Sequence, residues 1–263
     1  TLSPVASADL EIRRALRAGI DGFAIDVLAG GEHNVFPVLD ALFEAAERAD
    51  DPFEITFCLD NAGKNPLAIE YLLTRHGDSP KLARRDGKVL LFGYQSIWTG
   101  FEGAVRRFAE KHPERDEKQI GSLPAFRATP GGWRLLRKGF ADLEERFDTE
   151  MYFQFCISAF FHGMRGRPTE PVTMLDVVKV LAEDFGSIND FHGGGPKYDA
   201  MAAACRAVGC EWGEPMMYQY ENLLWSSFQI HPGAQELFDR WRKARENEST
   251  LIQFTTWNDY TEF

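Results

Sequence analysis

Two carboxylates near the end of the chain, Asp259 and Glu262, stand three residues apart and close to the aromatic residue Trp257. They follow the strand-like run 251–257, so the pattern places them at a strand tip, where a rigid element positions side chains and a loop exposes them. Two carboxylates beside one glycosidic bond suffice for its hydrolysis, because one protonates the leaving oxygen and the other activates water or attacks directly. We therefore predict that Asp259 and Glu262 are a catalytic pair. The alternative is a surface turn with two solvated acids.

Carboxylate, amide and aromatic side chains follow other strand-like segments as well. Such side chains suit a sugar, because carboxylates and amides hydrogen-bond hydroxyl groups and aromatic faces stack on the C–H faces of the ring. Asp26 and Asp60 have a structural alternative, since an Asp after a strand often caps the next helix. The aromatic residues could equally be packing. The predicted substrate-binding residues are Asp26, Asp60, Asn61, Trp98, Gln154, Tyr220, Glu221, Trp257 and Asn258.

Strand-like and helix-like segments alternate along the chain, which indicates βαβ units and a parallel sheet. The pattern predicts an α/β fold, a single (β/α)8 TIM barrel over residues 1–263 that lacks its first strand and last helix. An open doubly wound sheet is disfavoured because no Gly-x-Gly-x-x-Gly follows an early strand. The predicted strands are 22–27, 53–60, 89–94, 120–126, 151–157, 215–220 and 251–257, and the predicted helices are 9–18, 35–48, 66–75, 101–111, 133–146, 172–184, 198–208 and 234–246.

Charge, hydropathy and motif content argue against nucleic acid, a membrane span, a cofactor and a metal. The net charge of −11 disfavours nucleic acid, which needs a basic face. No run approaches the ~18 apolar residues of a membrane span. The glycine-rich run 192–196 lacks the ending of a phosphate loop, and no paired Cys-x-x-Cys or His-x-His is present, so we expect neither a cofactor nor a metal. The four cysteines are too few for a disulfide scaffold, and the sequence leaves open whether Cys205 and Cys210 bridge locally.

The run 254–262 resembles the Trp-Asn-Asp-Tyr-Gly-Glu segment of glycoside hydrolase family 71, the α-1,3-glucanases or mutanases. Residues 19–26, 55–60 and 87–89 are similar to further segments of that family in the same order. The resemblance implies a (β/α)8 barrel that hydrolyses α-linked glucan with inversion at the anomeric carbon. It also implies that Asp259 and Glu262 are the catalytic acids, and we favour Glu262 as proton donor and Asp259 as base.

The sequence departs from the family at two of these positions. Asp26 stands where the family has Asn, and Thr261 stands where it has Gly. Catalysis can therefore be preserved while the sugar differs. The alternatives are an endo-α-mannosidase-like hydrolase on a related barrel, a barrel that binds carbohydrate without cleaving it, and a metal-dependent hydrolase. A polysaccharide substrate implies a secreted or periplasmic protein, although no signal peptide is visible, and the oligomeric state is left open.

Overall fold

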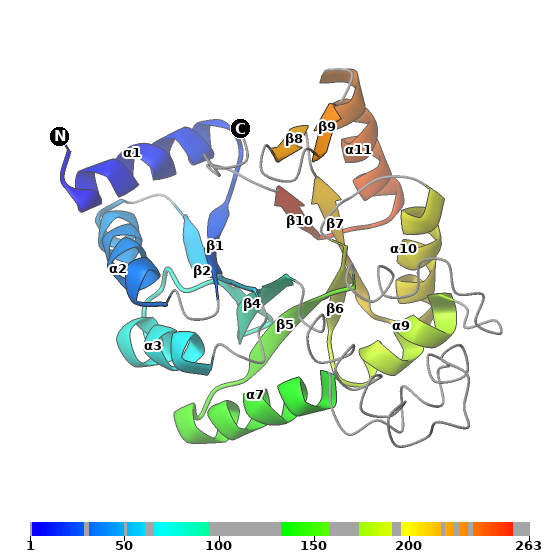
Figure 1. Ribbon diagram of the computed structural model, residues 1–263, viewed down its shortest axis with the longest axis horizontal. Coiled ribbons are helices and arrows are strands. Elements are labelled where there is room, and N and C mark those ends of the chain that lie inside the picture. Colours follow the sequence, from blue (N-terminus) through cyan, green and yellow to red (C-terminus); the bar gives the residue numbers. More distant parts are fainter. Residues whose placement is uncertain are drawn as a thin grey trace. The chain divides into compact units, whose positions relative to one another are not determined.

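The computed structural model describes residues 2–28, 32–49, 52–60, 66–94, 133–157, 174–190, 196–216, 219–222, 227–230 and 234–254. Strands and helices alternate through these ranges, as predicted (Figure 1). The chain forms two compact units. The first contains Thr1–His112 and Thr129–Phe155, and the second contains Pro113–Ala128 and Cys156–Phe263.

The first unit is a parallel sheet of strands in the order β1, β2, β4 and β5, with the short strand β3 antiparallel to β4. Helices α2, α3 and α7 lie on one face of this sheet (Figure 1). The elements are α1 (Pro4–Arg17), β1 (Gly22–Val27), α2 (Glu32–Arg48), β2 (Glu54–Asp60), α3 (Pro66–His76), β3 (Arg84–Arg85), β4 (Lys88–Tyr94), α7 (Trp133–Phe147) and β5 (Met151–Cys156).

Apolar runs explain why the strands of the first unit form and where its core lies. In β2 and β4 the five residues that follow the first are all buried, as expected for strands covered on both faces. The two-residue turn Asp86–Gly87, with both residues at positive φ (51° and 81°), joins β3 to β4. Asp-Gly is a common sequence for such a tight hairpin. The largest fully buried side chains of this unit include Phe43, Phe53 and Phe57.

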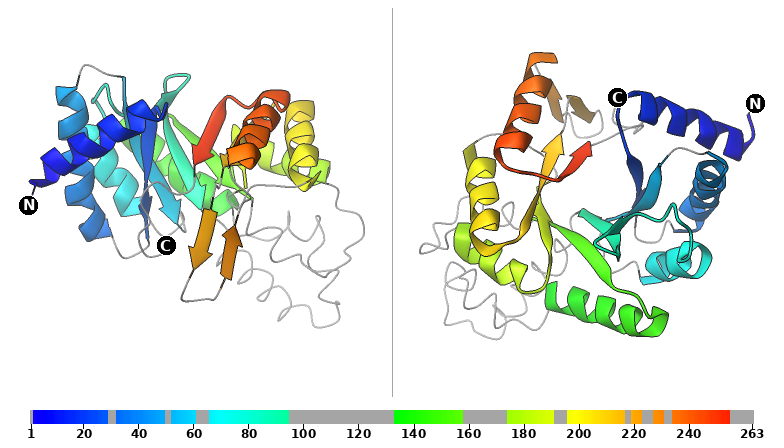
Figure 2. Two further views of the ribbon diagram at one scale, coloured as in Figure 1. Left: turned by 90° about the horizontal axis from the view of Figure 1, so that it is seen from above. Right: turned by 180° about the vertical axis from the view of Figure 1, so that it is seen from behind.

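The second unit is a parallel sheet in the order β6, β7 and β10, and a separate antiparallel hairpin of β8 and β9. Helices α9, α10 and α11 lie beside the three parallel strands (Figure 2). The elements are α9 (Met174–Ala182), β6 (Ser187–Asn189), α10 (Pro196–Val208), β7 (Glu211–Met216), β8 (Gln219–Asn222), β9 (Ser227–Ile230), α11 (Ala234–Glu246) and β10 (Leu251–Phe254).

The sequence-based assignment was wrong at two boundaries and missed one strand. The first helix begins at Pro4 instead of Asp9, because the Ser3 hydroxyl caps it by accepting from the Ala6 N–H at 3.2 Å. The strand predicted at 215–220 is divided between the end of β7 and the hairpin strand β8. The short strand β6 was not predicted at all. The predicted strand 120–126 and helix 101–111 lie outside the described residues.

Candidate active site

One row of side chains crosses the four parallel strands of the first unit near their carboxyl ends. Asp26 pairs in register with Cys58, Cys58 with Phe92, and Phe92 with Gln154. Residues paired in this way project to the same face of a parallel sheet, because side chains alternate between faces along each strand. Asp26 and Gln154, predicted from strand ends far apart in the sequence, therefore share one face.

A second row lies two residues further along the strands, where Asp60 pairs with Tyr94. A shift of two residues preserves the face, so Asp60 and Tyr94 project to the same side as Cys58 and Phe92. The structure thus brings Asp26, Asp60 and Gln154 to one face of the first unit, close to the carboxyl ends of its strands. Asp26 is exposed, Asp60 is half-buried and Gln154 is completely buried.

This face is the one turned away from helix α7. Phe153, the neighbour of Gln154 in β5, packs against Phe140 of α7 with ring centroids 4.9 Å apart. Because consecutive side chains point to opposite faces, Gln154 points away from that helix. In a (β/α)8 barrel the face without helices lines the barrel, and chemistry occurs at the carboxyl ends of the strands.

Asp26 and Asp60 do not cap the helices that follow them, because neither residue lies next to the start of a helix. Helix α2 begins at Glu32 and α3 begins at Pro66, whereas Asp26 and Asp60 both lie inside strands. An N-cap residue directly precedes the first helical residue, so neither carboxylate occupies that position.

The remaining predicted residues divide into two groups. Tyr220 and Glu221 lie in the hairpin strand β8, where they pair with Gln229 and Phe228 of β9. They therefore lie in a hairpin and not at the end of a strand of the parallel sheet, as the strand assignment 215–220 had implied, and their role in substrate binding stays a prediction. The predicted residues outside the described part of the chain are Asn61, Trp98, Trp257, Asn258, Asp259 and Glu262.

The second unit contributes polar residues that the sequence reasoning missed. Asn189 ends β6 and Asp190 follows it, and both are buried. The Asn189 side-chain amide donates to the Gln253 side-chain oxygen of β10 at 2.7 Å, although β7 lies between these strands. The bond can pass over β7 because Gly213, the register partner of Asn189, carries no side chain. The sequence did contain one signal for β6. Helices 174–182 and 196–208 follow each other, and in a repeating βα pattern a strand must lie between two such helices.

One buried acid of this unit has a structural role. Glu214 is 6% exposed, and its carboxylate accepts from the Trp212 indole N–H at 2.8 Å and from the Asn247 side-chain amide at 3.2 Å. Glu214 is adjacent to Gly213 in β7, so it points to the face opposite to the Asn189 row. Its charge is compensated by two donors on that face, and we assign it no catalytic role.

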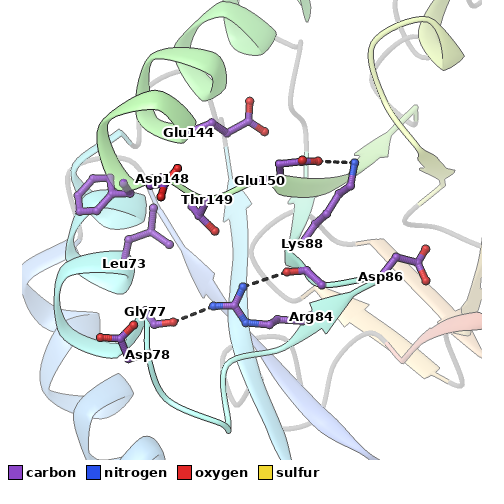
Figure 3. A pocket seen from close by; sticks show the side chains of 12 residues that line it. Leu73, Gly77, Asp78, Arg84, Asp86, Lys88, Glu144, Asp148, Thr149 and Glu150 are labelled. Atoms are coloured by element: carbon purple, nitrogen blue, oxygen red, sulfur yellow. Dashed lines mark hydrogen bonds and ion pairs between the residues drawn. The ribbon is translucent and has the colours of Figure 1, made fainter.

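A hollow of about 750 Å³ lies at the other end of the strands in the first unit (Figure 3). Lys88 begins β4 and Glu150 directly precedes β5, so this hollow faces the amino-terminal ends. The Lys88 ammonium forms an ion pair with Glu150 at 2.6 Å and lowers the pKa of that exposed carboxyl. Arg84 donates to the carbonyls of Gly77 at 2.7 Å and Gly87 at 3.1 Å. These contacts hold turns in place, at the barrel end that is not used for chemistry.

The described residues contain neither a metal-binding cluster nor a membrane-spanning helix. No group of three or more His, Cys, Asp or Glu side chains in the described ranges is arranged to hold a metal ion. Within the same ranges, no helix is both long and apolar enough to cross a membrane.

No protein-family model matches the chain. Glucan endo-1,3-alpha-glucosidase agn1 of Schizosaccharomyces pombe is 24% identical over 272 residues, which cover 98% of this chain and 53% of the relative. The chain resembles an α-1,3-glucanase. The resemblance inferred from residues 254–262 is thereby confirmed over nearly the whole chain, which spans about half the length of this α-1,3-glucanase relative.

Solved structures show the fold of this α-1,3-glucanase-like chain. A glycoside hydrolase family 99 endo-α-mannosidase from Bacteroides thetaiotaomicron matches with a TM-score of 0.64 and 13% identity, covering 100% of this chain and 74% of that one. A glycoside hydrolase-like protein matches with a TM-score of 0.57 and 12% identity, covering 100% and 79% of the two chains. The predicted fold class is confirmed, because the strands and helices correspond to a partial (β/α)8 barrel.

Proposed function

We propose that the chain is the catalytic barrel of an α-glycoside hydrolase that cleaves an α-1,3-glucan-like polysaccharide or oligosaccharide with inversion. The observation that carries this proposal is the position of Asp259 and Glu262 in the sequence. They follow β10, a parallel strand, in a chain similar over 98% of its length to a glucan endo-1,3-alpha-glucosidase. Carboxylates that follow barrel strands are where glycosidases of this architecture carry out chemistry.

In the proposed reaction Glu262 donates its proton to the glycosidic oxygen, and the bond from that oxygen to the anomeric carbon breaks. Asp259 removes a proton from a water molecule, whose oxygen attacks the anomeric carbon from the opposite side. The products are two shorter sugars, one with an inverted anomeric centre. Direct inversion requires a gap of ~6.5–9.5 Å between the carboxyl groups, to hold the attacking water.

The face shared by Asp26, Asp60 and Gln154 supports a sugar as the substrate. A carboxylate and an amide can hydrogen-bond neighbouring hydroxyl groups, and the register holds these side chains on one face. We propose that these three residues bind substrate, together with Asn61, Trp98, Trp257 and Asn258. The substrate class also implies a secreted or periplasmic enzyme that acts as one catalytic domain.

The test is a panel of α-glucans and α-mannans, with products followed by anomeric NMR. The expected result is cleavage of an α-1,3-glucan and first formation of the inverted anomer. Asp259→Asn and Glu262→Gln are each expected to lower kcat by ~10²–10⁴-fold, the usual contribution of a general acid or base. The matched control is Glu54→Gln, which neutralises an acid at the amino-terminal end of β2.

Other outcomes would redirect the proposal. Cleavage of α-mannan alone would favour an endo-α-mannosidase, a reaction compatible with the shared fold. A product with retained anomeric configuration would mean that one carboxylate attacks the anomeric carbon directly, in place of an activated water molecule. Tight binding without release of reducing ends would identify a carbohydrate-binding barrel, and loss of activity in a chelator would point to a metal-dependent hydrolase.

A further inference from the structure

Helix α10 ends in a motif that brings two cysteines together. The Cys210 N–H donates to the Cys205 carbonyl at 3.0 Å, and the Gly209 N–H donates to the Arg206 carbonyl at 3.2 Å. Gly209 has φ of +71°. These two bonds and the left-handed glycine define a Schellman motif, in which the residue after the glycine contacts the residue five positions earlier. Here those two residues are Cys205 and Cys210.

The two thiols are buried against each other. Cys205 is 0% exposed and Cys210 is 7% exposed, and both are free thiols in the structure. A hydrogen bond with Cys210, followed by burial, raises the pKa of the Cys205 thiol. The Cys210 sulfur also lies 3.5 Å from the Gly186 carbonyl oxygen, so the pair occupies the space between α10 and the segment leading into β6. At the two positions of the motif that usually make an apolar contact, this chain has the two buried cysteines.

We propose that Cys205 and Cys210 form an intramolecular disulfide when the chain folds under oxidising conditions. The helix cap joins the two residues by a backbone hydrogen bond and so keeps them close, and a bridge needs Cα atoms roughly 4.4–6.8 Å apart. The oxidant is a small disulfide such as oxidised glutathione. One cysteine thiolate attacks it and releases one glutathione thiol, then the second cysteine attacks the mixed disulfide and releases the other. The two cysteine protons end on the two released glutathione sulfurs, and the two electrons reduce the glutathione disulfide to two thiols.

The raised pKa determines when this exchange occurs. Thiolates are the attacking species, and the hydrogen bond with Cys210, together with burial, raises the pKa of Cys205 and so keeps it as a thiol in the folded chain. The bridge therefore forms during folding or when the end of α10 opens, and it then resists reduction for the same reason. The bridge would tie the end of α10 to the start of β7, because Cys205 lies in α10 and Cys210 directly precedes β7. Strand β7 lies between β6 and β10 in the sheet. The proposal is independent of the catalytic function proposed above.

The sequence supplies a specific assay, because trypsin cleaves after Arg206 between the two cysteines. The full chain is refolded in oxidised and reduced glutathione, blocked with N-ethylmaleimide in denaturant, and digested without reductant. The expected product is peptide 198–206 linked to peptide 207–240, with two thiols alkylated per chain, those of Cys58 and Cys156. Cys58→Ala is the matched control and is expected to leave the linked peptide unchanged.

A second measurement tests the consequence of the bridge. A sample refolded in tris(carboxyethyl)phosphine is expected to melt a few degrees below the one refolded under oxidising conditions, and a Cys205→Ser/Cys210→Ser variant should show no such difference. Alkylation of all four thiols after oxidative refolding would overturn the proposal, and so would a linked peptide containing Cys58 or Cys156. The peptide map of the unmodified chain decides the question even if the double variant fails to fold.

Discussion

Replacing Glu214 by leucine is expected to lower the free energy of unfolding by about 3 kcal/mol. The reason is that the leucine leaves two buried donors, the Trp212 indole N–H and the Asn247 amide, without their acceptor. Each unpaired buried donor costs about 1–3 kcal/mol, and the longer Asn247 bond of 3.2 Å belongs at the low end of that range. This loss is a large fraction of the ~5–15 kcal/mol stability of a typical protein.

Glutamine at the same position is expected to cost only about 1 kcal/mol. Both donors meet the same carboxylate oxygen, so the single amide oxygen of glutamine can accept both bonds. What is lost is the charge, and hydrogen bonds to charged groups are roughly twice as strong as neutral ones. Glu214→Gln and Glu214→Leu differ little in volume, and the comparison therefore isolates hydrogen bonding from packing.

The assay is urea unfolding followed by circular dichroism, since Trp212 itself would distort a fluorescence signal. Turnover is measured in parallel, well below the melting temperature. Equal destabilisation by both substitutions would refute the reasoning, because it would make the charge, and not the acceptor, the essential property. A Glu214→Gln protein of nearly normal stability that lost turnover would instead identify Glu214 as a catalytic acid.

Two further predictions concern the first unit. Gly22→Ala is expected to lower the free energy of unfolding by about 1–3 kcal/mol, because a Cβ there would lie 2.5 Å from the backbone oxygen of Glu54. The control is Gly139→Ala in α7, where a Cβ meets nothing within 4 Å. That substitution is expected to raise the free energy of unfolding by about 0.5–1 kcal/mol. Urea midpoints measure both, and equal values would contradict the close approach of β1 to β2. The pKa of Tyr71 is raised, mainly by burial and then by the hydrogen bond that its hydroxyl donates to Asp40. The folded state therefore holds this proton more tightly than the unfolded state does. Stability should consequently fall as the pH rises above ~10, the usual pKa of tyrosine. The Tyr71→Phe variant should lose that part of the slope, and an unchanged pH profile would contradict it.

The strand ends of the first unit could be predicted from the sequence because they depend on residues that are neighbours in the chain. The runs in β2 and β4 are apolar, each ends in a polar residue, and parallel strands align their carboxyl ends. That alignment is enough to place Asp26, Asp60 and Gln154 on one end of the sheet. The sequence alone could not provide the register, which puts them on the same face, since a shift by one residue would reverse the face of every side chain on a strand.

The second unit was harder to predict because its polar residues depend on distant partners. Ser187–Asn189 has only three residues, and two of them are polar, so no apolar run marks it as a strand. Asn189 is buried there because Gln253, 64 residues away, accepts its hydrogen bond. Such a partner is visible only once β7 lies between β6 and β10 with a glycine at the crossing point.

Pro215 shows why residues 211–216 did not read as a central strand. Proline has no N–H to donate, so its presence argues against the middle of a sheet, and β7 lies between β6 and β10. In β7 the Glu211 N–H donates to the Gly186 carbonyl at 3.0 Å, on the β6 side. Residues two and four positions later point the same way, so the nitrogen of Pro215 also faces β6. But β6 ends at Asn189, whose register partner is Gly213. The ladder on that side therefore ends before it reaches Pro215, and the missing donor removes no hydrogen bond to β6.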